Sequence, residues 1–523
     1  MKKRQDKIEF LLLFLILAIA GFLRFYKLKE FQFFTYDQAR DALIIKRIVV
    51  DRKLTLLGPT VLIPGFYLPP FYYYLMAPVL FLGKLDPVAL DLFSGFTGVG
   101  LVLAVFWATN QFFGRPAGFF SAFLLATSPL MVDLSRRAWN PNSVPMLSLI
   151  LIYFLYRFFK EEQGFFLFLA SLIFGFSLSF HYSIIGFLPV ILLAFYWQLK
   201  SKKKFFWVVA SILTIFLLIS PLFLFELRHN FSLTKSFLSF FKSFKTPGKI
   251  MTFEKIKRFL ISPFQLAVGT PFGFFQKSLP LKTNLEKFYS QAPLIYAPVS
   301  IVSHQRQVLY YPKFAILICL LAMGIVFKSY KKYFLAINLF LGLILSGVLI
   351  SLLYPGDFHF YFYDFLFPVS FLVLGLSFKT FWQKKIFRPI ILLLAFSMGL
   401  VNSSFSLKQE ASAPSVDQII KVSQAIGQDI GEAPFNLAVN HRFADRWDRN
   451  AVEYRYFVEA YFKKIPLSDS PADYAKAESL YFIDEAGSSK ILDVKIMEVE
   501  KFQPRKIAQE WDLDGVKLYK LTK

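Results

Sequence analysis

Long apolar segments separated by short polar stretches make up most of this chain. A helix needs roughly 17–25 predominantly apolar residues to cross the hydrocarbon core of a bilayer. Segments of this kind lie at about residues 8–26, 88–112, 116–132, 142–158, 164–180, 182–198, 205–225, 312–328, 333–353, 360–379 and 388–405. The pattern therefore predicts a mainly α-helical, polytopic membrane bundle with about 11 spans.

The C-terminal part, from about residue 411 to 523, follows a different pattern. It contains more than half of the acidic residues and no apolar segment long enough to cross a membrane. Amphipathic and alternating stretches in it predict a small α/β domain. The expected elements are helices over 416–430 and 450–462 and strands over 435–439, 480–483 and 516–521. We therefore divide the chain into a membrane domain, 1–405, and a second domain, 406–523.

Composition supports a membrane protein and excludes several other classes. Of the 523 residues, 56% are hydrophobic and 19% are aromatic, which is more than a single soluble core could bury. The net charge of +24 comes from 59 Lys and Arg against 35 Asp and Glu. Because the basic residues cluster between apolar segments, we attribute them to membrane topology and expect no nucleic acid as a partner. A single cysteine, Cys319, excludes an intramolecular disulfide and a cysteine-rich metal site.

Four basic clusters predict the orientation of the spans. They are Lys2–Arg4, Lys200–Lys204, Lys328–Lys332 and Lys384–Arg388. With 11 spans, all four fall on one side of the membrane, and the positive-inside rule makes that side cytoplasmic. The N-terminus is then inside and the second domain is outside. The external loop over 226–311 is also basic, with 12 Lys and Arg against 3 Asp and Glu, which favours contact with anionic membrane lipids or lipid phosphates.

The first external loop begins with a candidate catalytic helix. Thr35 and Gln38 have the spacing of a capping box, which predicts a helix from about residue 36. This helix is too short and too charged to cross the membrane, so we expect it to lie in the interface. Asp37 and Asp41 share one of its faces, where an acid could deprotonate an acceptor hydroxyl while Arg40 meets a phosphate. In the alternative interpretation, the acids only stabilise the N-terminus of the helix.

The rest of that loop, which extends to residue 87, is rich in proline, glycine and aromatic residues. Proline and glycine within 57–74 predict that no regular helix forms there. The aromatic side chains, Tyr67 and Tyr72 among them, suit an aromatic belt at the membrane interface. They could instead stack on a sugar ring and so line a sugar or acceptor pocket.

These features resemble the GT-C membrane glycosyltransferases, and in particular the dolichyl-phosphate-mannose protein mannosyltransferase and aminoarabinose transferase superfamily. The resemblance extends over about residues 8–405. Four segments carry it, in this order and on one predicted side of the membrane: Tyr36–Asp41, Ser128–Asn142, Phe225–Asn230 and His359–Pro368.

The resemblance implies a donor, a base and a location. In this family the acid of the first loop is the catalytic base, and the donor is a polyprenyl-phosphate sugar. Asp37 matches that acid, basic residues would stabilise the leaving phosphate, and the anomeric carbon would be inverted. Many relatives also carry an Asp near the start of the fourth span, where this chain has Asn140-Pro-Asn142, so no cofactor is indicated although a divalent metal stays open. The family branch implies a prokaryotic plasma membrane, with the active site outside the cytoplasm.

Other ionisable residues fall at the same predicted membrane face. The residues assigned to the donor phosphate, besides Arg40, are Arg136, Arg137, Arg228 and His229. The residues assigned to the sugar or acceptor pocket, besides Tyr67 and Tyr72, are His181, His359 and Tyr361. Polar groups near membrane depth often have a function, but interfacial Arg and His side chains also simply anchor the ends of spans. The histidines are too scattered for a metal site, and no glycine-rich phosphate loop points to a nucleotide-sugar donor.

The sequence thus predicts an integral membrane glycosyltransferase, hexosyl or pentosyl. It would move a sugar from a polyprenyl phosphate to an extracytoplasmic lipid, glycan or protein. Two other classes stay open. A multispan transporter or lipid flippase would usually show inverted repeats and charges at span centres, which this sequence lacks. An oligosaccharide ligase or polymerase of the cell envelope would use a pyrophosphate-linked donor instead.

Overall fold

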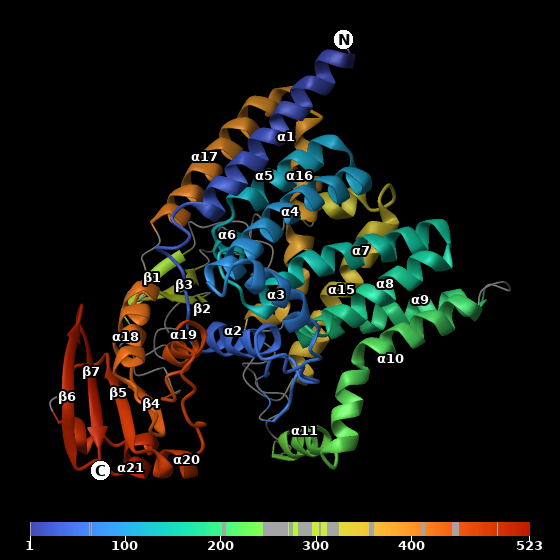
Figure 1. Ribbon diagram of the computed structural model, residues 1–523. Helices are drawn as coiled ribbons and strands as arrows, with labels where there is room; N and C mark the ends of the chain where they lie inside the picture. Colours follow the sequence, from blue (N-terminus) through green and yellow to red (C-terminus); the bar gives the residue numbers. More distant parts are fainter. Residues whose placement is uncertain are drawn as a thin grey trace.

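Helices dominate the structure, which is a computed structural model. It describes residues 2–61, 63, 65–200, 205–243, 270, 276–280, 295–302, 305–310, 324–354, 360–408, 414–441, 449–488 and 490–523. The predicted fold class, a mainly α-helical membrane bundle with a small C-terminal α/β unit, is confirmed (Figure 1).

Eight helical segments in the described part of the chain are long and apolar enough to cross a membrane. They contain the helices α1 (Lys2–Phe25), α4 (Val88–Phe113), α7 (Val144–Glu161), α9 (Leu188–Lys200), α10 (Phe205–Arg228), α15 (Phe334–Leu353), α16 (Phe367–Trp382) and α17 (Arg388–Leu407). Short 3-10 turns precede some of them: η1 (Asn140–Ser143), η2 (Tyr182–Phe187), η5 (Phe360–Leu366) and η6 (Lys385–Phe387). The predicted segment 312–328 falls largely outside the described residues, so the total number of spans stays a prediction.

Two predicted spans have a different form. The helix α8 (Gly164–Ser177) has only 14 residues. The predicted span 116–132 is broken into α5 (Arg115–Thr127) and α6 (Pro129–Ser135), which meet at an angle of 64°. The break is encoded locally, because a residue before proline avoids the helical conformation. Ser128 instead becomes the N-cap of α6, and its hydroxyl accepts a hydrogen bond from the amide of Met131 at 3.3 Å.

Small residues allow the central helices to pack closely. At Gly375 of α16, a Cβ atom would lie only 2.7 Å from the carbonyl oxygen of Ala117 in α5. The hydroxyl of Ser121 donates to the carbonyl of Phe371 at 2.8 Å across the same contact. Close backbone approach and interhelical hydrogen bonds of this kind stabilise helix pairs in lipid, where burial from water contributes little.

The two ends of the bundle carry different elements. At one end, Lys379 donates to the hydroxyl of Tyr333 at 2.8 Å, and that ring packs on Phe113 at the end of α4. At the other end, the carbonyl of Leu85, just before α4, accepts a hydrogen bond from Tyr456 of the C-terminal unit at 2.6 Å. The basic cluster that precedes α15 is therefore opposite the C-terminal unit, as the charge pattern predicts. Which of the two ends faces the cytoplasm stays a prediction.

The C-terminal unit is a four-stranded sheet with helices, and its strand order is β4-β5-β7-β6 (Figure 1). Its elements are α18 (Val416–Asp429), β4 (Phe435–Asn440), α19 (Val452–Phe462), α20 (Pro471–Lys476), β5 (Ser479–Asp484), η7 (Ile491–Asp493), α21 (Met497–Phe502), β6 (Lys506–Leu513) and β7 (Val516–Thr522). The strands β4 and β5 are parallel, with Phe435 opposite Ser479, and the other pairs are antiparallel. Both predicted helices and all three predicted strands of this domain are present.

Several short elements were not predicted. The first half of the edge strand β6 is exposed on both faces, so it lacks the apolar alternation that identifies a strand. The helices α20 and α21 have six residues each, too few for a helical period to be visible. In the loop over 226–311, β1 (Gln276–Pro280), β3 (Gln305–Tyr310) and β2 (Ile295–Val302) form a separate antiparallel sheet.

The loop between α1 and α4, predicted to be external, contains two helices, α2 (Tyr36–Val49) and α3 (Phe71–Leu82). The predicted start at residue 36 is confirmed, with Thr35 as the N-cap. The predicted capping box is wrong, because the Thr35 hydroxyl donates to Oε1 of Gln38 at 2.9 Å and accepts no backbone N–H. The expectation that 57–74 contains no helix is also wrong at its end. The helix α3 begins directly after Pro70, where proline costs no helical hydrogen bond.

Candidate active site

The helix α2 is buried in the protein along one side. It packs between α3 of the membrane domain and α19 of the C-terminal unit (Figure 1). Ala39, Ala42 and Ile45 on that side are completely buried. The helix therefore lies in the interface between the two parts of the chain, and its position depends on both of them.

Arg40 joins the two candidate catalytic acids of α2. Its Nη1 lies 2.8 Å from Oδ1 of Asp37, and its Nε and Nη2 lie 2.9 and 2.7 Å from Oδ1 of Asp41. Nη1 also lies 2.6 Å from the hydroxyl of Thr60. Burial alone would lower the pKa of Arg40, but the charges of Asp41 and Asp37 outweigh it and raise that pKa. Most of the hydrogen-bonding capacity of this guanidinium is thus committed to the acids.

Asp41 is the inner acid of this group. Its side chain is 2% exposed, and Oδ1 accepts a further hydrogen bond from the hydroxyl of Tyr73 at 2.8 Å. Oδ2 is buried and has no hydrogen-bond partner among the described residues. Burial raises the pKa of Asp41 to about 6, although Arg40 acts in the opposite direction. Asp41 is therefore suited to holding Arg40 but not to reaching a substrate.

Asp37 is the outer acid. Its side chain is 40% exposed, so the unbonded part of the carboxylate is open to a second molecule. It also lies close enough to Tyr361 of η5 to interact with it electrostatically. A carboxylate held on one side by an arginine and open on the other can accept a proton from a bound hydroxyl.

The loop after α2 is fixed beside this pair. Thr60, which bonds to Arg40, forms an isolated antiparallel bridge with Tyr67. The carbonyl of Tyr67 accepts a hydrogen bond from Tyr182 at 2.9 Å. Tyr67 is thus placed near the two acids. Tyr72, assigned to the same pocket, is 1% exposed and packs against Tyr73 and Phe180, a position within the core of the loop.

His181 and Tyr361, predicted from distant parts of the sequence, lie side by side. Their ring centroids are 5.3 Å apart, and Tyr361 also contacts Trp139 at 5.0 Å. Because Tyr361 interacts with Asp37, the aromatic group and the outer acid belong to one region. Aromatic faces next to a carboxylate are suited to binding a sugar. His359, assigned to the same pocket, lies outside the described residues.

The two arginines after α6 are held inside the protein. Arg136 is 1% exposed, and its guanidinium donates to the carbonyls of Leu23 in α1 and Ser406 in α17. This position favours a structural role at the ends of three helices over binding of a phosphate. Arg137 is 14% exposed, forms an ion pair with Asp133 at 2.7 Å, and lies over the ring of Phe33.

Arg228 and His229 are exposed at the corner between α10 and α11 (Ser232–Ser243). The buried carboxylate of Glu226 forms this corner by accepting the amides of Leu233 and Thr234 at 2.7 and 3.0 Å. The ring of His229 stacks on that of Phe225, with the two ring centroids 3.9 Å apart. No described side chain pairs with the Arg228 guanidinium, which is therefore open to an anion.

The corner is connected to the acid group through aromatic contacts. Phe237 of α11 packs on Phe66 at 5.4 Å, and Phe66 packs on Tyr182 at 5.6 Å. Tyr182 in turn donates to the carbonyl of Tyr67, which is bridged to Thr60, a hydrogen-bond partner of Arg40. The exposed cation and the exposed acid thus lie on neighbouring elements at one end of the bundle.

The C-terminal unit holds α2 through charged and aromatic contacts. The carboxylate of Glu459 in α19 is 3% exposed and lies 2.7 Å from Arg47 and 3.7 Å from Lys46. Phe34, just before α2, contacts the rings of Tyr456 and Phe457 at 5.4 Å each. Movement of the C-terminal unit would therefore move the helix that carries Asp37.

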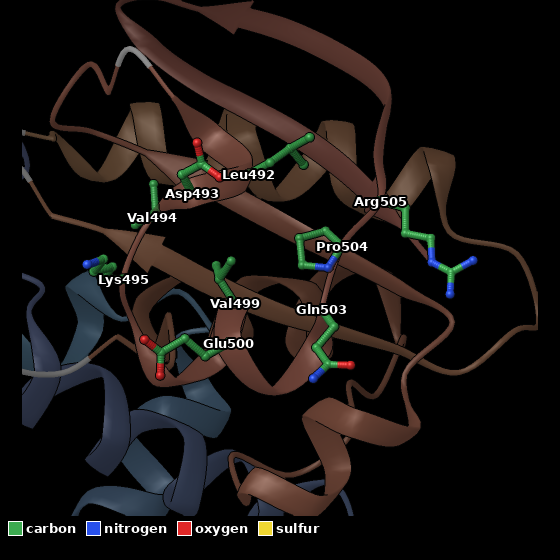
Figure 2. A pocket seen from close by; sticks show the side chains of 9 residues that line it. All are labelled: Leu492, Asp493, Val494, Lys495, Val499, Glu500, Gln503, Pro504 and Arg505. Carbon is green, nitrogen blue, oxygen red and sulfur yellow. The ribbon is translucent and has the colours of Figure 1, made fainter.

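A metal site and a surface hollow are two further places where a ligand could bind. Within the described residues, no group of three or more His, Cys, Asp and Glu side chains could hold a metal ion. Arg40 occupies the space between Asp37 and Asp41, so this pair does not fit a divalent metal. A surface hollow lies entirely within the C-terminal unit and contains no residue of α2 (Figure 2). It is lined by Leu492, Asp493, Val494, Lys495, Val499, Glu500, Gln503, Pro504 and Arg505.

Several residues of this region were not found from the sequence. Trp139, Tyr73, Ser183 and Asp364 became visible only because the fold brings them against residues that were predicted. The one usable signal was the acid Asp364 within an apolar segment, because a charged group at that depth is rarely without a purpose.

Comparison with known proteins agrees with this architecture. Residues 68–225 match the family model described as dolichyl-phosphate-mannose-protein mannosyltransferase. No curated protein matches the sequence.

Solved structures of low sequence identity share the fold. The structure of ArnT from Cupriavidus metallidurans bound to undecaprenyl phosphate aligns over 97% of this chain and 97% of its own, with a TM-score of 0.55 and 9% identity. The archaeal oligosaccharyltransferase AglB from Archaeoglobus fulgidus, in complex with an inhibitory peptide and a dolichol-phosphate, aligns over 91% of this chain and 69% of its own. Its TM-score is 0.53 and its identity is 11%. At these identities the likeness concerns the fold alone.

Proposed function

We propose that this chain transfers a sugar from a polyprenyl-phosphate donor to an acceptor hydroxyl, on the basis of the family match over residues 68–225 and the fold it shares with ArnT and AglB. The family match and the polyprenyl phosphates named with ArnT and AglB support the donor class. The observation that carries the proposal is the unequal exposure of the two acids. Asp37 is 40% exposed and Asp41 is 2% exposed, so one carboxylate can meet a substrate while the other holds Arg40.

In the proposed reaction Asp37 is the general base. It accepts the proton of the acceptor hydroxyl as that oxygen forms a bond to the anomeric carbon. The bond from the anomeric carbon to the phosphate oxygen breaks, and the polyprenyl phosphate leaves with the bonding electrons. Attack from the side opposite the leaving group inverts the anomeric carbon. Asp41 acts as a positioning residue, because it fixes Arg40 and, through Arg40, the orientation of Asp37.

Arg228 and His229 are proposed to bind the phosphate of the donor. Arg228 is exposed and carries no described partner, whereas Arg137 and Arg40 are paired with acids. A charge-assisted hydrogen bond to the phosphate strengthens as negative charge develops on the leaving group. The sugar would then lie toward Tyr361, His181 and Tyr67.

The two parts of the chain have separate tasks in this proposal. The membrane domain, 1–405, would bind the donor and carry the base, while the second domain, 406–523, would hold α2 in place. Both would use the extracytoplasmic side of the plasma membrane. Cysteines introduced for Asp514 and for Lys331, in a background without Cys319, test this arrangement. An impermeant thiol reagent added to whole cells should label the first and not the second, and the reverse pattern would place Asp37 on the cytoplasmic side.

The donor is tested with purified protein in lipid nanodiscs. Radiolabelled polyprenyl-phosphate sugars, hexosyl and pentosyl, are supplied with envelope lipids, glycans or proteins as acceptors, and release of polyprenyl phosphate is measured. Wild type should consume at least one such donor, and Asp37→Asn should not. Consumption of pyrophosphate-linked donors alone would favour a ligase or polymerase. Movement of lipid-linked sugar across the bilayer without transfer would favour a flippase.

A further inference from the structure

His181 is held by an unusual hydrogen bond at the start of η2. Its backbone is extended, with φ −162° and ψ 145°, and its side chain serves as the N-cap of this turn. The ring atom Nδ1 lies 3.2 Å from the backbone nitrogen of Ser183. That amide can only donate, so Nδ1 must accept and cannot carry a proton.

This contact determines the tautomer of the imidazole. A neutral histidine has one ring nitrogen with a proton and one without. With Nδ1 accepting from the Ser183 amide, the proton is on Nε2. A second proton on Nδ1 would place two donors against each other in a buried site. His181 is therefore neutral and has one available N–H.

The nearby acid does not convert His181 into a cation. Oδ2 of Asp364 lies 3.9 Å from Nδ1, too far for a hydrogen bond. Oδ1 of Asp364 accepts instead from the hydroxyl of Ser183 at 2.5 Å. Asp364 thus fixes the residue whose amide caps His181, and both act as positioning residues. Burial also lowers the pKa of His181 to about 3, which agrees with the neutral form.

The free side of the ring lies in the proposed sugar region. The side chain is 12% exposed, and within the described residues no group forms a hydrogen bond to Nε2. Tyr361 and Phe362 flank the ring at centroid distances of 5.3 and 5.4 Å. The titratable groups around this site, among the described residues, include Asp364 and Tyr361 and, beyond Tyr361, Asp37 and Tyr354.

We propose that His181 is a permanently neutral donor that gives its Nε2–H to a hydroxyl or ring oxygen of the bound sugar. It is neither a second base nor a cation for the lipid phosphate. The proposal deepens the proposed function, on which its ligand depends. A neutral donor suits a sugar oxygen, because it adds orientation without attracting the phosphate away from Arg228.

The tautomer is tested directly by nuclear magnetic resonance. The chain has 5 histidines, so ¹⁵N-histidine labelling in nanodiscs gives few signals, and a His181→Gln sample assigns the one of interest. We expect an unprotonated Nδ1 and a protonated Nε2 from pH 5 to pH 8. An imidazolium signal, or a proton on Nδ1, overturns the proposal whether or not a donor has been identified.

The ligand is tested with paired variants. His181→Gln keeps an N–H donor near the position of Nε2, whereas His181→Phe keeps a flat ring without one. We expect His181→Phe to lower kcat/KM about tenfold, the value of one neutral hydrogen bond, and His181→Gln to lower it less than about threefold. Equal activity of the two variants would show that no donor is needed.

The positioning role of Asp364 and the parent function are tested separately. Asp364→Asn, which retains an acceptor for Ser183, should keep the tautomer, while Asp364→Ala should produce a mixture of tautomers in the same spectra. An unchanged spectrum in Asp364→Ala refutes this role. If wild type consumes no polyprenyl-phosphate sugar, the proposed function fails, and the spectra still decide the state of His181.

Discussion

Replacing Asp37 with asparagine should separate catalysis from folding. The change removes the proton acceptor and keeps the shape of the side chain and its place in the first turn of α2. A general base contributes about 10²–10⁴-fold to the rate, so turnover should fall by that factor, or about 3–5.5 kcal/mol in activation free energy. The side chain is 40% exposed, and its ion pair with Arg40 at 2.8 Å is screened by solvent. The free energy of unfolding should therefore fall by at most about 1 kcal/mol.

Asp41→Asn is the matched control. Asp41 is 2% exposed, and burial already disfavours its charged form, so asparagine should leave the stability at neutral pH unchanged or higher. In this variant Asp37 is the one charged partner left to Arg40 in this group, and the attraction of the guanidinium makes Asp37 a weaker base. Because the base itself is still present, we expect a smaller loss of turnover, of about tenfold.

The assay measures single-turnover release of polyprenyl phosphate and thermal unfolding for both variants in the same nanodiscs. If Asp37 only stabilises the helix N-terminus, Asp37→Asn will remain active. An active Asp37→Asn beside an inactive Asp41→Asn would transfer the role of base to Asp41. Full activity in both variants would refute the mechanism.

Three further outcomes are expected. Arg228→Ala should raise the apparent KM for the donor about 10- to 150-fold with little change in melting temperature. Arg136→Ala removes a buried hydrogen-bond donor to carbonyls at helix ends, so it should lower the melting temperature and leave the KM for the donor unchanged. Glu459→Gln should lower the free energy of unfolding by roughly 1–3 kcal/mol and reduce turnover, because Lys46 loses a buried partner and α2 loses its support. Glu510→Gln, at the exposed ion pair with Lys517, should change neither quantity. Burial raises the pKa of Asp41 to about 6, so the uncharged Asp41 side chain contributes to the free energy of unfolding below about pH 4, and this contribution is lost as the pH rises through 6. Thermal unfolding should show wild type losing stability relative to Asp41→Asn over that range. Parallel curves for the two proteins would contradict a raised pKa for Asp41.

The sequence by itself determined the elements whose cause is local. An apolar segment about 20 residues long can satisfy its backbone in lipid only as a helix, so the predicted spans within the described residues are helical. The start of α2 at Tyr36 was also predicted correctly, although the capping box on which that prediction relied does not form. The spacing of Asp37, Arg40 and Asp41 likewise places these residues together on any helix, because positions three and four apart are neighbours.

Tertiary structure decided what each charged residue can do. Asp37 and Asp41 look equivalent in sequence, but packing buries Asp41 to 2% exposure, beside Tyr73 from 32 residues further on, and leaves Asp37 40% exposed. Arg136 and Arg228 are both basic residues at the end of a span. The first is covered by carbonyls 113 and 270 residues away, whereas the second remains exposed. Burial is set by segments that are distant along the chain, and no local pattern records which segment will arrive. His181 is the clearest case, because its proton is placed by Ser183 nearby while its neighbours Tyr361 and Asp364 come from the far end of the membrane domain.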